Sequence, residues 1–369
     1  MPKFDFCEEI VAQDRLHGGD IRPYLKAGAG GGFIDFSANI NPLGLSSRVK
    51  DVILKNVDRV VHYPEPDSGH LRKALASFHG VGEENIALGN GSIELIYLIP
   101  RAMAARKALI VTPTFSEYEF SAISGGAKPT FFETRENEEF IVDFGRIEKA
   151  VPRSGLVFFC NPNNPTDVLY GRQEIGRLLQ LCVRKDSVLV VDEVFMDFVD
   201  DAARFSMISE AAKRRHLLVL RSLTKFFALP GLRVGYAVGH RGLVERTRRL
   251  QYPWNINSLA QAAAEEALRD DDYMQKSRAY ISGERQYLFG SLNDIEGLRA
   301  YPPSSNFIFC KLGSGRIKSA KELNSRLLSK GMVIRDCGNF RGLGPRFFRV
   351  AVRKREENTR LLRRLKELL

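Results

Sequence analysis

The stretch of residues 221–236, RSLTKFFALPGLRVGY, directly follows a short apolar run. A continuous apolar run of this kind is typical of a strand that is buried on both faces. The hydroxyls of Ser222 and Thr224, with the guanidinium of Arg233, are suited to bind a phosphate. Just past the run, the amine of Lys225 can form an imine with an aldehyde. The stretch therefore indicates a site for a phosphorylated aldehyde at the end of a buried strand.

The centre of the chain alternates short apolar runs with longer amphipathic stretches, such as Ser92–Ala105 and Gln173–Arg184. Apolar strands that are separated by helices indicate a mainly parallel sheet covered on both faces. In such sheets, ligands bind beyond the carboxyl ends of the strands. The predicted strands are Asn85–Leu88, Ala108–Val111, Leu156–Cys160, Ser187–Val191, His216–Leu220 and Val234–Val238.

Both chain ends differ from this centre. Residues 16–44 are rich in glycine and proline, which indicates an irregular arm. From about Ala260 a helical stretch leads to strand-like runs at Asn306–Lys311, Met332–Arg335 and Phe347–Val352. The chain of 369 residues also exceeds what one hydrophobic core usually supports. We therefore expect an α/β fold with an N-terminal arm (1–45), a large domain (46–258) and a smaller α+β domain (259–369).

The composition disfavours several classes of protein. The net charge is +11, but the basic residues are spread along the chain without the basic stripe or stacking module of a nucleic-acid-binding protein. No apolar run approaches the roughly 20 residues of a membrane helix, and the N-terminus lacks the pattern of a signal peptide. The five cysteines are scattered without a C-x-x-C pair. We therefore expect a cytoplasmic protein without a metal site, a membrane partner or a nucleic-acid partner.

Three other predicted strands also end in residues that can carry chemistry. Gly89-Asn90-Gly91-Ser92 precedes a helix, where exposed N–H groups favour a phosphate, although a tight turn also suits these glycines. The segment Asn161–Thr166, NPNNPT, is a rigid loop with hydrogen-bonding amides, or simply a turn. Asp192 ends an apolar strand, where its carboxylate either needs a partner or caps a helix.

Together, these strand ends carry the groups that pyridoxal 5′-phosphate (PLP) requires. The phosphate of PLP needs N–H groups, hydroxyls and an arginine, and its aldehyde needs a lysine amine. The ring needs an aromatic face and a carboxylate that keeps the pyridine nitrogen protonated. The sequence therefore favours PLP as the cofactor.

The order of the motifs resembles that of the fold-type I PLP-dependent enzymes, particularly the histidinol-phosphate aminotransferase branch. These motifs are GNGS (89–92), PTF (113–115), NPNNPT (161–166), DE (192–193), SLTK (222–225) and GLRVGY (231–236). Within that branch, the chain is most similar to the threonine-phosphate decarboxylase family of cobalamin biosynthesis. This similarity rests on HGG (17–19), DFSANINPLG (35–44), PWNIN (253–257) and VIRDCGNFRGLGPRFFRVAVR (333–353). The resemblance implies a large domain with a mainly parallel sheet and a smaller α+β domain.

The resemblance also implies how individual residues would bind the cofactor. Lys225 would carry PLP as an imine, and Asp192 would pair with the ring nitrogen. Phe115 would stack on the ring, and Asn164 would hydrogen-bond its phenolic oxygen. The cofactor phosphate would be bound by Gly91, Ser92, Ser222 and Arg233, beside Thr224, and by Tyr63 of the neighbouring subunit in a homodimer.

A phosphorylated amino acid is the implied substrate. Arg349 would bind the substrate carboxylate. Arg335, with His17, Gly19 and Asn39 of the arm, would help to bind and enclose the substrate.

Two positions depart from patterns common among the relatives. The family loop usually has the sequence NPTG, whereas Asp167 replaces its glycine here and puts an acid near the site. Phe195 stands where many aminotransferases have a tyrosine that contacts the phenolic oxygen of PLP, and the decarboxylase branch resembles this chain in having phenylalanine there. The loss of that donor is consistent with a shift away from transamination.

The implied reaction is the loss of CO2 from L-threonine O-3-phosphate, which gives (R)-1-aminopropan-2-yl phosphate, with Lys225 as proton donor to Cα. One alternative is histidinol-phosphate:2-oxoglutarate transamination. Another is a phosphoserine-preferring decarboxylase that makes ethanolamine phosphate, because one methyl group contributes only about 1–3 kcal/mol of discrimination. A non-catalytic regulator that has kept the fold is a third, which the set of Asp192, Lys225 and Arg233 disfavours.

Overall fold

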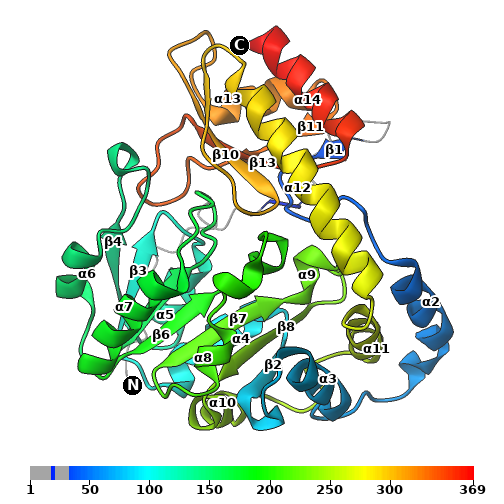
Figure 1. The fold of residues 1–369 in the computed structure, drawn as a ribbon, viewed down its shortest axis with the longest axis vertical. Coiled ribbons are helices and arrows are strands. Elements are labelled where there is room, and N and C mark those ends of the chain that lie inside the picture. Colours follow the sequence, from blue (N-terminus) through cyan, green and yellow to red (C-terminus); the bar gives the residue numbers. More distant parts are fainter. Residues whose placement is uncertain (1–17, 21–32) are drawn as a thin grey trace, which may run out of the picture.

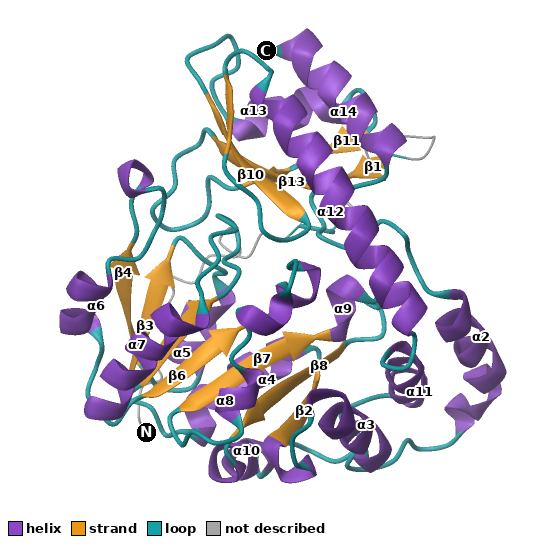
Figure 2. Ribbon diagram, viewed as in Figure 1, coloured by secondary structure: helices purple, strands orange, loops and turns teal. Residues whose placement is uncertain are grey.

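The computed structural model describes residues 18–20 and 33–369. Within this part of the chain, a seven-stranded sheet lies at the centre of the larger portion of the molecule (Figures 1 and 2). Its strands are β2 Ile86–Asn90, β3 Lys107–Thr112, β4 Lys128–Glu133, β5 Leu156–Cys160, β6 Val188–Asp192, β7 Leu217–Ser222 and β8 Val234–Gly239. The strand order is β2-β8-β7-β6-β5-β3-β4. Strand β8 runs antiparallel to both neighbours, and the other pairs are parallel.

Alternate residues of these strands face two cores, one on each side of the sheet. The helices around the sheet are α2 Ser47–Asn56, α3 Gly69–His79, α4 Ser92–Ala102, α5 Glu117–Ser124, α6 Phe144–Ala150, α7 Arg172–Arg184, α8 Ile208–Ala211, α9 Leu223–Phe226, α10 Arg241–Arg248 and α11 Ser258–Ala267. Leu189 and Val191 of β6 pack with residues of α3, α7 and α11, whereas Val190 packs with residues of α4, α5 and α10. Because both of their faces are covered, β5, β6 and β7 consist mostly of apolar residues.

The register of the strands brings their functional ends together. Cys160 at the end of β5 pairs with Asp192 at the end of β6, and Asp192 pairs with Leu220 of β7. Ser222, which ends β7, lies opposite Gly235 in β8. The polar residues that follow the parallel strands therefore meet at one edge of the sheet.

The C-terminal part of the chain forms a smaller layered unit beside this edge (Figure 1). Its elements are β1 Ile34–Asp35, α12 Asp271–Asn293, β9 Leu298–Ala300, β10 Phe307–Leu312, α13 Ala320–Leu328, β11 Met332–Val333, β12 Arg335–Asp336, β13 Phe347–Ala351 and α14 Arg355–Leu368. Strands β12-β13-β10-β9 form an antiparallel sheet, and β1 pairs in parallel with β11. A segment from near the N-terminus is thus built into the C-terminal unit.

Helix α12 connects the two portions of the molecule (Figure 1). Its residues Met274 and Ile281 pack in the core of the large sheet. Farther along the helix, Leu288 and Leu292 pack in the core of the C-terminal unit. One helix therefore belongs to both cores. The domain limits at residues 45 and 258 stay a prediction.

The predicted α/β fold class is confirmed, and the six predicted strands of the large sheet agree with the observed ones within two residues at each end. Strand β4 was not predicted, because it lies at the sheet edge, alternates in exposure and contains Pro129. The prediction of one continuous run at Met332–Arg335 is wrong. The chain changes partner at Ile334, so that β11 pairs with β1 and β12 pairs with β13.

Within residues 18–20 and 33–369, no helix has the length and apolar content needed to cross a membrane. The same residues contain no group of three or more His, Cys, Asp or Glu side chains that could hold a metal ion.

Candidate active site

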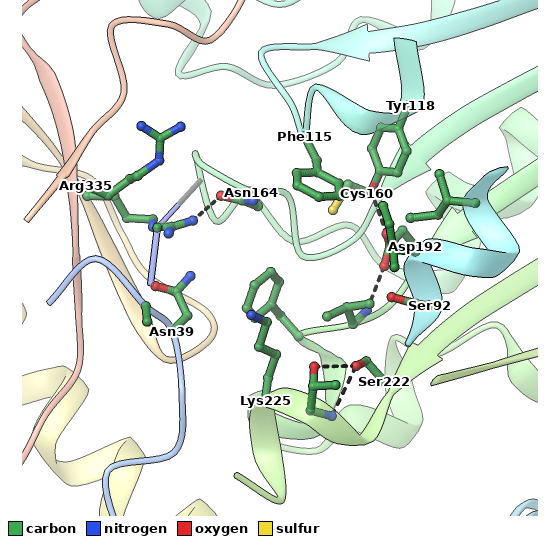
Figure 3. Close-up of a pocket in the computed structure, with 18 of the residues that line it drawn as sticks. Asn39, Ser92, Phe115, Tyr118, Cys160, Asn164, Asp192, Ser222, Lys225 and Arg335 are labelled. Carbon is green, nitrogen blue, oxygen red and sulfur yellow. Dashed lines mark hydrogen bonds between the residues drawn. The ribbon is translucent and has the colours of Figure 1, made fainter. Parts of the chain in front are cut away.

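A cavity of about 200 Å³ lies between the carboxyl edge of the large sheet and the C-terminal unit. Figure 3 shows Asn39 and Arg335 on one side of it, and Lys225, Ser222 and Asp192 on the other. The cavity therefore brings together side chains from distant parts of the sequence. The predicted site residues that line it are Asn39, Ser92, Phe115, Asn164, Asp192, Ser222, Thr224, Lys225, Arg233, Arg335 and Arg349.

A cradle for an anion forms where the start of α4 approaches Arg233. Gly91 has a φ of +73°, and a Cβ atom built on it would lie 2.6 Å from Nη2 of Arg233. A Cβ atom on Gly235 would lie 2.2 Å from the backbone nitrogen of Ser92. Both positions therefore require glycine. The close approach leaves the first N–H groups of an eleven-residue helix beside a guanidinium, which suits a phosphate.

The start of α9 supplies the other side of this cradle. Ser222 caps the helix, since its Oγ accepts a hydrogen bond of 3.2 Å from the backbone N–H of Thr224. The hydroxyls of Ser222 and Thr224 also lie 2.7 Å apart, within hydrogen-bond distance. The cap fixes both hydroxyls where the sheet ends and sets Lys225 one residue farther along the chain.

Lys225 lies among positive charges. Its pKa is lowered to about 8, first by the loss of solvation and then by the charges of Arg349 and Arg233. A lysine with a lowered pKa is more often a neutral amine near neutral pH. The amine is therefore suited to attack a carbonyl and to exchange a proton with a bound substrate.

Asp192 is held by two hydrogen-bond donors at the bottom of the cavity. The hydroxyl of Tyr118 donates to Oδ2 at 2.7 Å, and the backbone N–H of Val194 donates to Oδ1 at 3.0 Å (Figure 3). Burial nevertheless raises the pKa of Asp192 to about 6. Each carboxylate oxygen keeps a lone pair for a further donor. Asp192 can therefore accept a hydrogen bond from a protonated ring nitrogen, and that positive charge would keep it ionised.

Sequence analysis missed Tyr118. Its ring stacks on Phe158 with centroids 5.1 Å apart and contacts Phe115 edge to face at 5.7 Å. Tyr118 lies three positions after Phe115, and α5 begins between them at Glu117, so this closeness in sequence could have suggested that both lie near the same site. The other cavity-lining residues that were missed are Gly18, Ser37, Ala38, Ile93, Ile96, Cys160, Val194 and Phe340.

Arg335 and Arg349 approach the cavity from adjacent strands. Their Cα atoms are partners in the register of β12 with β13, so the two side chains lie next to each other. Arg349 is 5% exposed and donates to Oδ1 of Asn164 and, at 2.9 Å, to the carbonyl oxygen of Ser37. Arg335 donates to Oδ1 of Asn339 at 2.9 Å. Two adjacent cations indicate a ligand with more than one anionic group.

The side chain of Asn39 is buried in the wall of the same cavity. Neither its Oδ1 nor its Nδ2 has a hydrogen-bond partner in the described part of the protein. A buried amide without a partner is costly, so such a group is expected to meet a polar ligand. Asn39 therefore adds a donor and an acceptor beside the paired arginines.

Gly91 forms the cradle beside the cavity, and two predicted site residues in the described part of the chain, Tyr63 and Gly19, have other positions. Tyr63 lies outside the cavity, is 83% exposed and contacts the tilted ring of Trp254 with ring centroids 5.0 Å apart. The N–H of Gly19 donates to the Oγ of Ser37 at 2.9 Å, while its neighbour Gly18 lines the cavity. His17 lies outside the described residues.

A buried ion network lies beside the ends of β6 and β7. Arg221 of β7 contacts Oε2 of Glu193 at 3.1 Å and also pairs with Asp197. Glu193 also accepts hydrogen bonds from the Ser206 hydroxyl and the Met207 backbone N–H, both at 2.7 Å. The network joins the residue after Asp192 to the residue before Ser222, and so it fixes β6 and β7 relative to each other.

The arrangement fits PLP. The cradle at Gly91, whose space a Cβ atom would fill, suits the phosphate, and Lys225 suits the aldehyde. Asp192 suits the ring nitrogen, and Phe115, which lines the same cavity, suits the face of the ring. Asn164 lines the same cavity and suits the phenolic oxygen.

The fold and site define an enzyme of the α/β class with a reactive lysine at the carboxyl edge of its sheet. The sequence matches the family "Aminotransferase class I and II" over residues 32–365, and the chain belongs to this family.

Individual relatives are similar over nearly the whole chain. A threonine-phosphate decarboxylase from Salmonella typhimurium is 36% identical over 356 residues, covering 96% of both chains. An adenosylcobalamin biosynthesis bifunctional protein from Leptospira interrogans is 34% identical over 94% of this chain and 40% of its own length. A histidinol-phosphate aminotransferase from Moorella thermoacetica is 34% identical over 91% of this chain and 85% of its own.

Two solved structures of other proteins, with the same two kinds of activity in their names, are also similar to this chain. The L-threonine-O-3-phosphate decarboxylase from Porphyromonas gingivalis matches with a TM-score of 0.80 at 28% identity, covering 91% of this chain and 99% of that one. The histidinol-phosphate aminotransferase from Clostridium acetobutylicum matches with a TM-score of 0.81 at 33% identity, covering 91% and 98%.

Proposed function

We propose that this protein is a PLP-dependent carboxy-lyase that converts L-threonine O-3-phosphate into (R)-1-aminopropan-2-yl phosphate and CO2 in cobalamin biosynthesis. The names of the Salmonella and Leptospira relatives support this proposal. The observation that carries it is the pair of adjacent arginines, Arg335 and Arg349, which line the same cavity as Lys225. The proposed substrate has two anionic groups, a carboxylate and a phosphate, and each can take one guanidinium.

The cofactor would be held by the cradle at Gly91 and Arg233, by Asp192 and by Lys225. When bound, PLP supplies an aldehyde that reacts with amines and a protonated ring that accepts electrons from the breaking Cα–carboxylate bond. Asp192 keeps the proton on the ring nitrogen, because its carboxylate is fixed by Tyr118 and Val194 in a buried position. That position makes the electrostatic stabilisation strong.

The substrate would be oriented by the C-terminal unit. Arg349 binds the carboxylate, and Arg335 binds the phosphate with the help of the Asn39 amide, which has no partner among the described residues. This choice of partners decides which bond at Cα is aligned for cleavage. The amine of Lys225, with a pKa of about 8, then delivers a proton to Cα after CO2 has left.

Phe195 also lines the cavity and packs edge to face on Phe307, with ring centroids 5.1 Å apart. A hydrocarbon ring stands where a tyrosine would place a hydroxyl near the phenolic oxygen of the cofactor. This absence of a hydroxyl at position 195 favours decarboxylation over transamination in the proposal.

A homodimer is a further part of the proposal. The surface around η2 (Val57–Val61) exposes large apolar side chains, with Val61 78% and Tyr63 83% exposed beside Trp254 at 45%. Exposed apolar residues in one region favour an interface with another protein. A second copy of this chain would cover the region and bring Tyr63 to the phosphate cradle of its partner. Mixing Tyr63→Ala subunits with Lys225→Ala subunits should then restore activity, whereas sedimentation as a monomer would contradict the dimer.

The experiment that tests the function compares three substrates with the PLP-loaded protein. L-Threonine O-3-phosphate should release CO2, L-serine O-phosphate should do so more slowly, and L-histidinol phosphate with 2-oxoglutarate should give no glutamate. Lys225→Ala should abolish turnover and the absorbance band of the lysine-linked cofactor. Absence of CO2 from threonine phosphate at saturating PLP would refute the proposal. Glutamate formation would instead support the histidinol-phosphate aminotransferase function that the Moorella relative carries.

A further inference from the structure

Asp167 occupies a backbone conformation that ordinarily favours glycine. It is the last residue of the loop Asn161–Asp167 and has a φ of +60°. Its backbone N–H donates to the carbonyl oxygen of Asn163 at 2.7 Å, which closes the loop tightly. A residue with a side chain is strained at this φ, although aspartate tolerates it better than most. The side chain must therefore make contacts that offset the strain.

The carboxylate of Asp167 binds the other portion of the molecule. Its Oδ2 accepts hydrogen bonds of 2.8 Å from the backbone N–H groups of both Ser304 and Ser305. Its Oδ1 accepts a hydrogen bond of 2.6 Å from the hydroxyl of Ser305. Asp167 is 1% exposed, and Ser305 is fully buried. The side chain of Asp167, in the large portion, thus accepts hydrogen bonds from three donors of Ser304 and Ser305 in the C-terminal unit.

Ser304 and Ser305 lie directly before β10, and β10 pairs with β13. Phe309 of β10 is the register partner of Arg349, which is the arginine that contacts Asn164. Asn164 lies three residues before Asp167 in the same loop. The loop therefore contacts the C-terminal unit twice, through the carboxylate of Asp167 and through the amide of Asn164.

The carbonyl groups of Ser304 and Ser305 also accept hydrogen bonds. Nη1 of Arg285, on α12, donates to the carbonyl oxygens of Ser304 at 3.0 Å and Ser305 at 3.2 Å. It also donates to the carbonyl oxygen of Phe198 at 3.2 Å. The segment at Ser304 and Ser305 is thus held between a carboxyl group that binds its N–H groups and a guanidinium that binds its carbonyl groups.

We propose that Asp167 is a positioning residue that fixes the start of β10 on the large portion and thereby sets Arg349 against Asn164 over the cofactor site. Sequence analysis identified this position only as a departure from glycine. The proposal rests on the proposed function for the identity of the substrate, but the fixation of β10 is independent of it.

The test compares Asp167→Gly with a matched control. Glycine accepts the positive φ without strain, so this variant removes the carboxylate and leaves the loop conformation available. Asp186→Gly makes the same change at another aspartate with positive φ (52°), whose side chain is 81% exposed. Asp167→Asn is the conservative variant, because its amide can accept from the two N–H groups and donate to the Ser305 hydroxyl.

Three measurements on the PLP-loaded protein are informative. In Asp167→Gly, amide hydrogen exchange at residues 304–306 should become faster, while the visible absorbance of the bound cofactor stays unchanged. The KM for threonine phosphate should rise by about tenfold or more, with a smaller change in kcat, because misplacement of a substrate-binding arginine weakens binding. Asp167→Asn should restore most of the protection and the KM, and Asp186→Gly should match the wild type.

Unchanged exchange at residues 304–306 in Asp167→Gly, or a KM equal to that of Asp186→Gly, would overturn the proposal. If Asp167→Gly does not fold, Ser305→Ala provides the same test, because it removes only the hydroxyl donor to Oδ1. Failure of the wild type to act on threonine phosphate would refute the proposed function, and the exchange measurement would still decide the role of Asp167.

Discussion

The hydroxyl of Tyr118 donates a 2.7 Å hydrogen bond to Oδ2 of Asp192, at the bottom of the cavity. Asp192 belongs to a strand end, and Tyr118 belongs to α5, 74 residues earlier in the chain. Desolvation raises the pKa of Asp192, whereas the Tyr118 and Val194 hydrogen bonds lower it. Tyr118 therefore helps to keep a buried carboxylate ionised.

We expect Tyr118→Phe to retain the stacked ring and to raise the pKa of Asp192 above about 6. Because a hydrogen bond to a charged group contributes about 1.5–3 kcal/mol, kcat should fall by about tenfold or more. A pH titration of the bound cofactor's absorbance should shift along with the kcat profile. Tyr97→Phe is the matched control, since it removes a 2.5 Å tyrosine–carboxylate bond to Glu117 outside the cavity. Equal effects of the two substitutions would contradict a specific role for Tyr118.

The free energy of unfolding of the cofactor-free protein should depend on Asp192. Its pKa rises from 3.8 to about 6 on folding because burial disfavours the charge. The folded state thus binds this proton more tightly, so the contribution is fully present below pH 3.8 and is lost as pH rises through 6.

Asp192→Asn removes this titration. We expect the cofactor-free variant to be more stable than the wild type at pH 8, by up to about 3 kcal/mol, and the difference to shrink toward pH 4. Denaturant unfolding at both pH values measures this difference. The same variant should bind PLP more weakly, because it lacks the charge for the ring nitrogen. A variant that is less stable at pH 8 would show that hydrogen bonds outweigh the cost of burying the charge.

The paired arginines should differ in the anion that each one binds. Lysine keeps the charge but loses the planar fork of the guanidinium, so each Arg→Lys variant should weaken one contact. Arg335→Lys should lose competitive inhibition by inorganic phosphate in the PLP-loaded enzyme and keep inhibition by acetate. Arg349→Lys should show the opposite pattern. The reverse outcome would exchange the two assignments without changing the proposed reaction.

Gly91→Ala should weaken cofactor binding. The added Cβ atom would lie 2.6 Å from Nη2 of Arg233, and the residue has a φ of +73° that disfavours side chains. We expect the PLP dissociation constant to rise by at least about tenfold, in line with the loss of one charge-assisted hydrogen bond. Equilibrium titration with PLP measures it. Gly176→Ala on α7 is the control, because its Cβ atom meets no atom of the described residues within 4 Å. This substitution should stabilise the helix by up to about 1 kcal/mol.

Local sequence patterns were sufficient for the large sheet and for much of its edge. Strands covered on both faces are apolar without interruption, so β5, β6 and β7 were recognisable, and Lys225 and Asp192 follow directly from where such strands end. Edge strand β4 and the break at Ile334 were not recognisable. The bounds of these strands depend on the strand with which each one pairs. A short segment of sequence contains little information about its pairing partner.

The sequence alone determined the fold class, the cofactor and the lysine at the centre of the site. These follow from composition, periodicity and motifs, each of which acts over a few neighbouring residues. Tertiary structure alone decided that Tyr118 binds Asp192, that Arg335 and Arg349 are register partners, and that Asp167 contacts Ser304 and Ser305. Those contacts join residues far apart in the chain, and their geometry is set by strand register and by the packing of two cores, which no local pattern encodes.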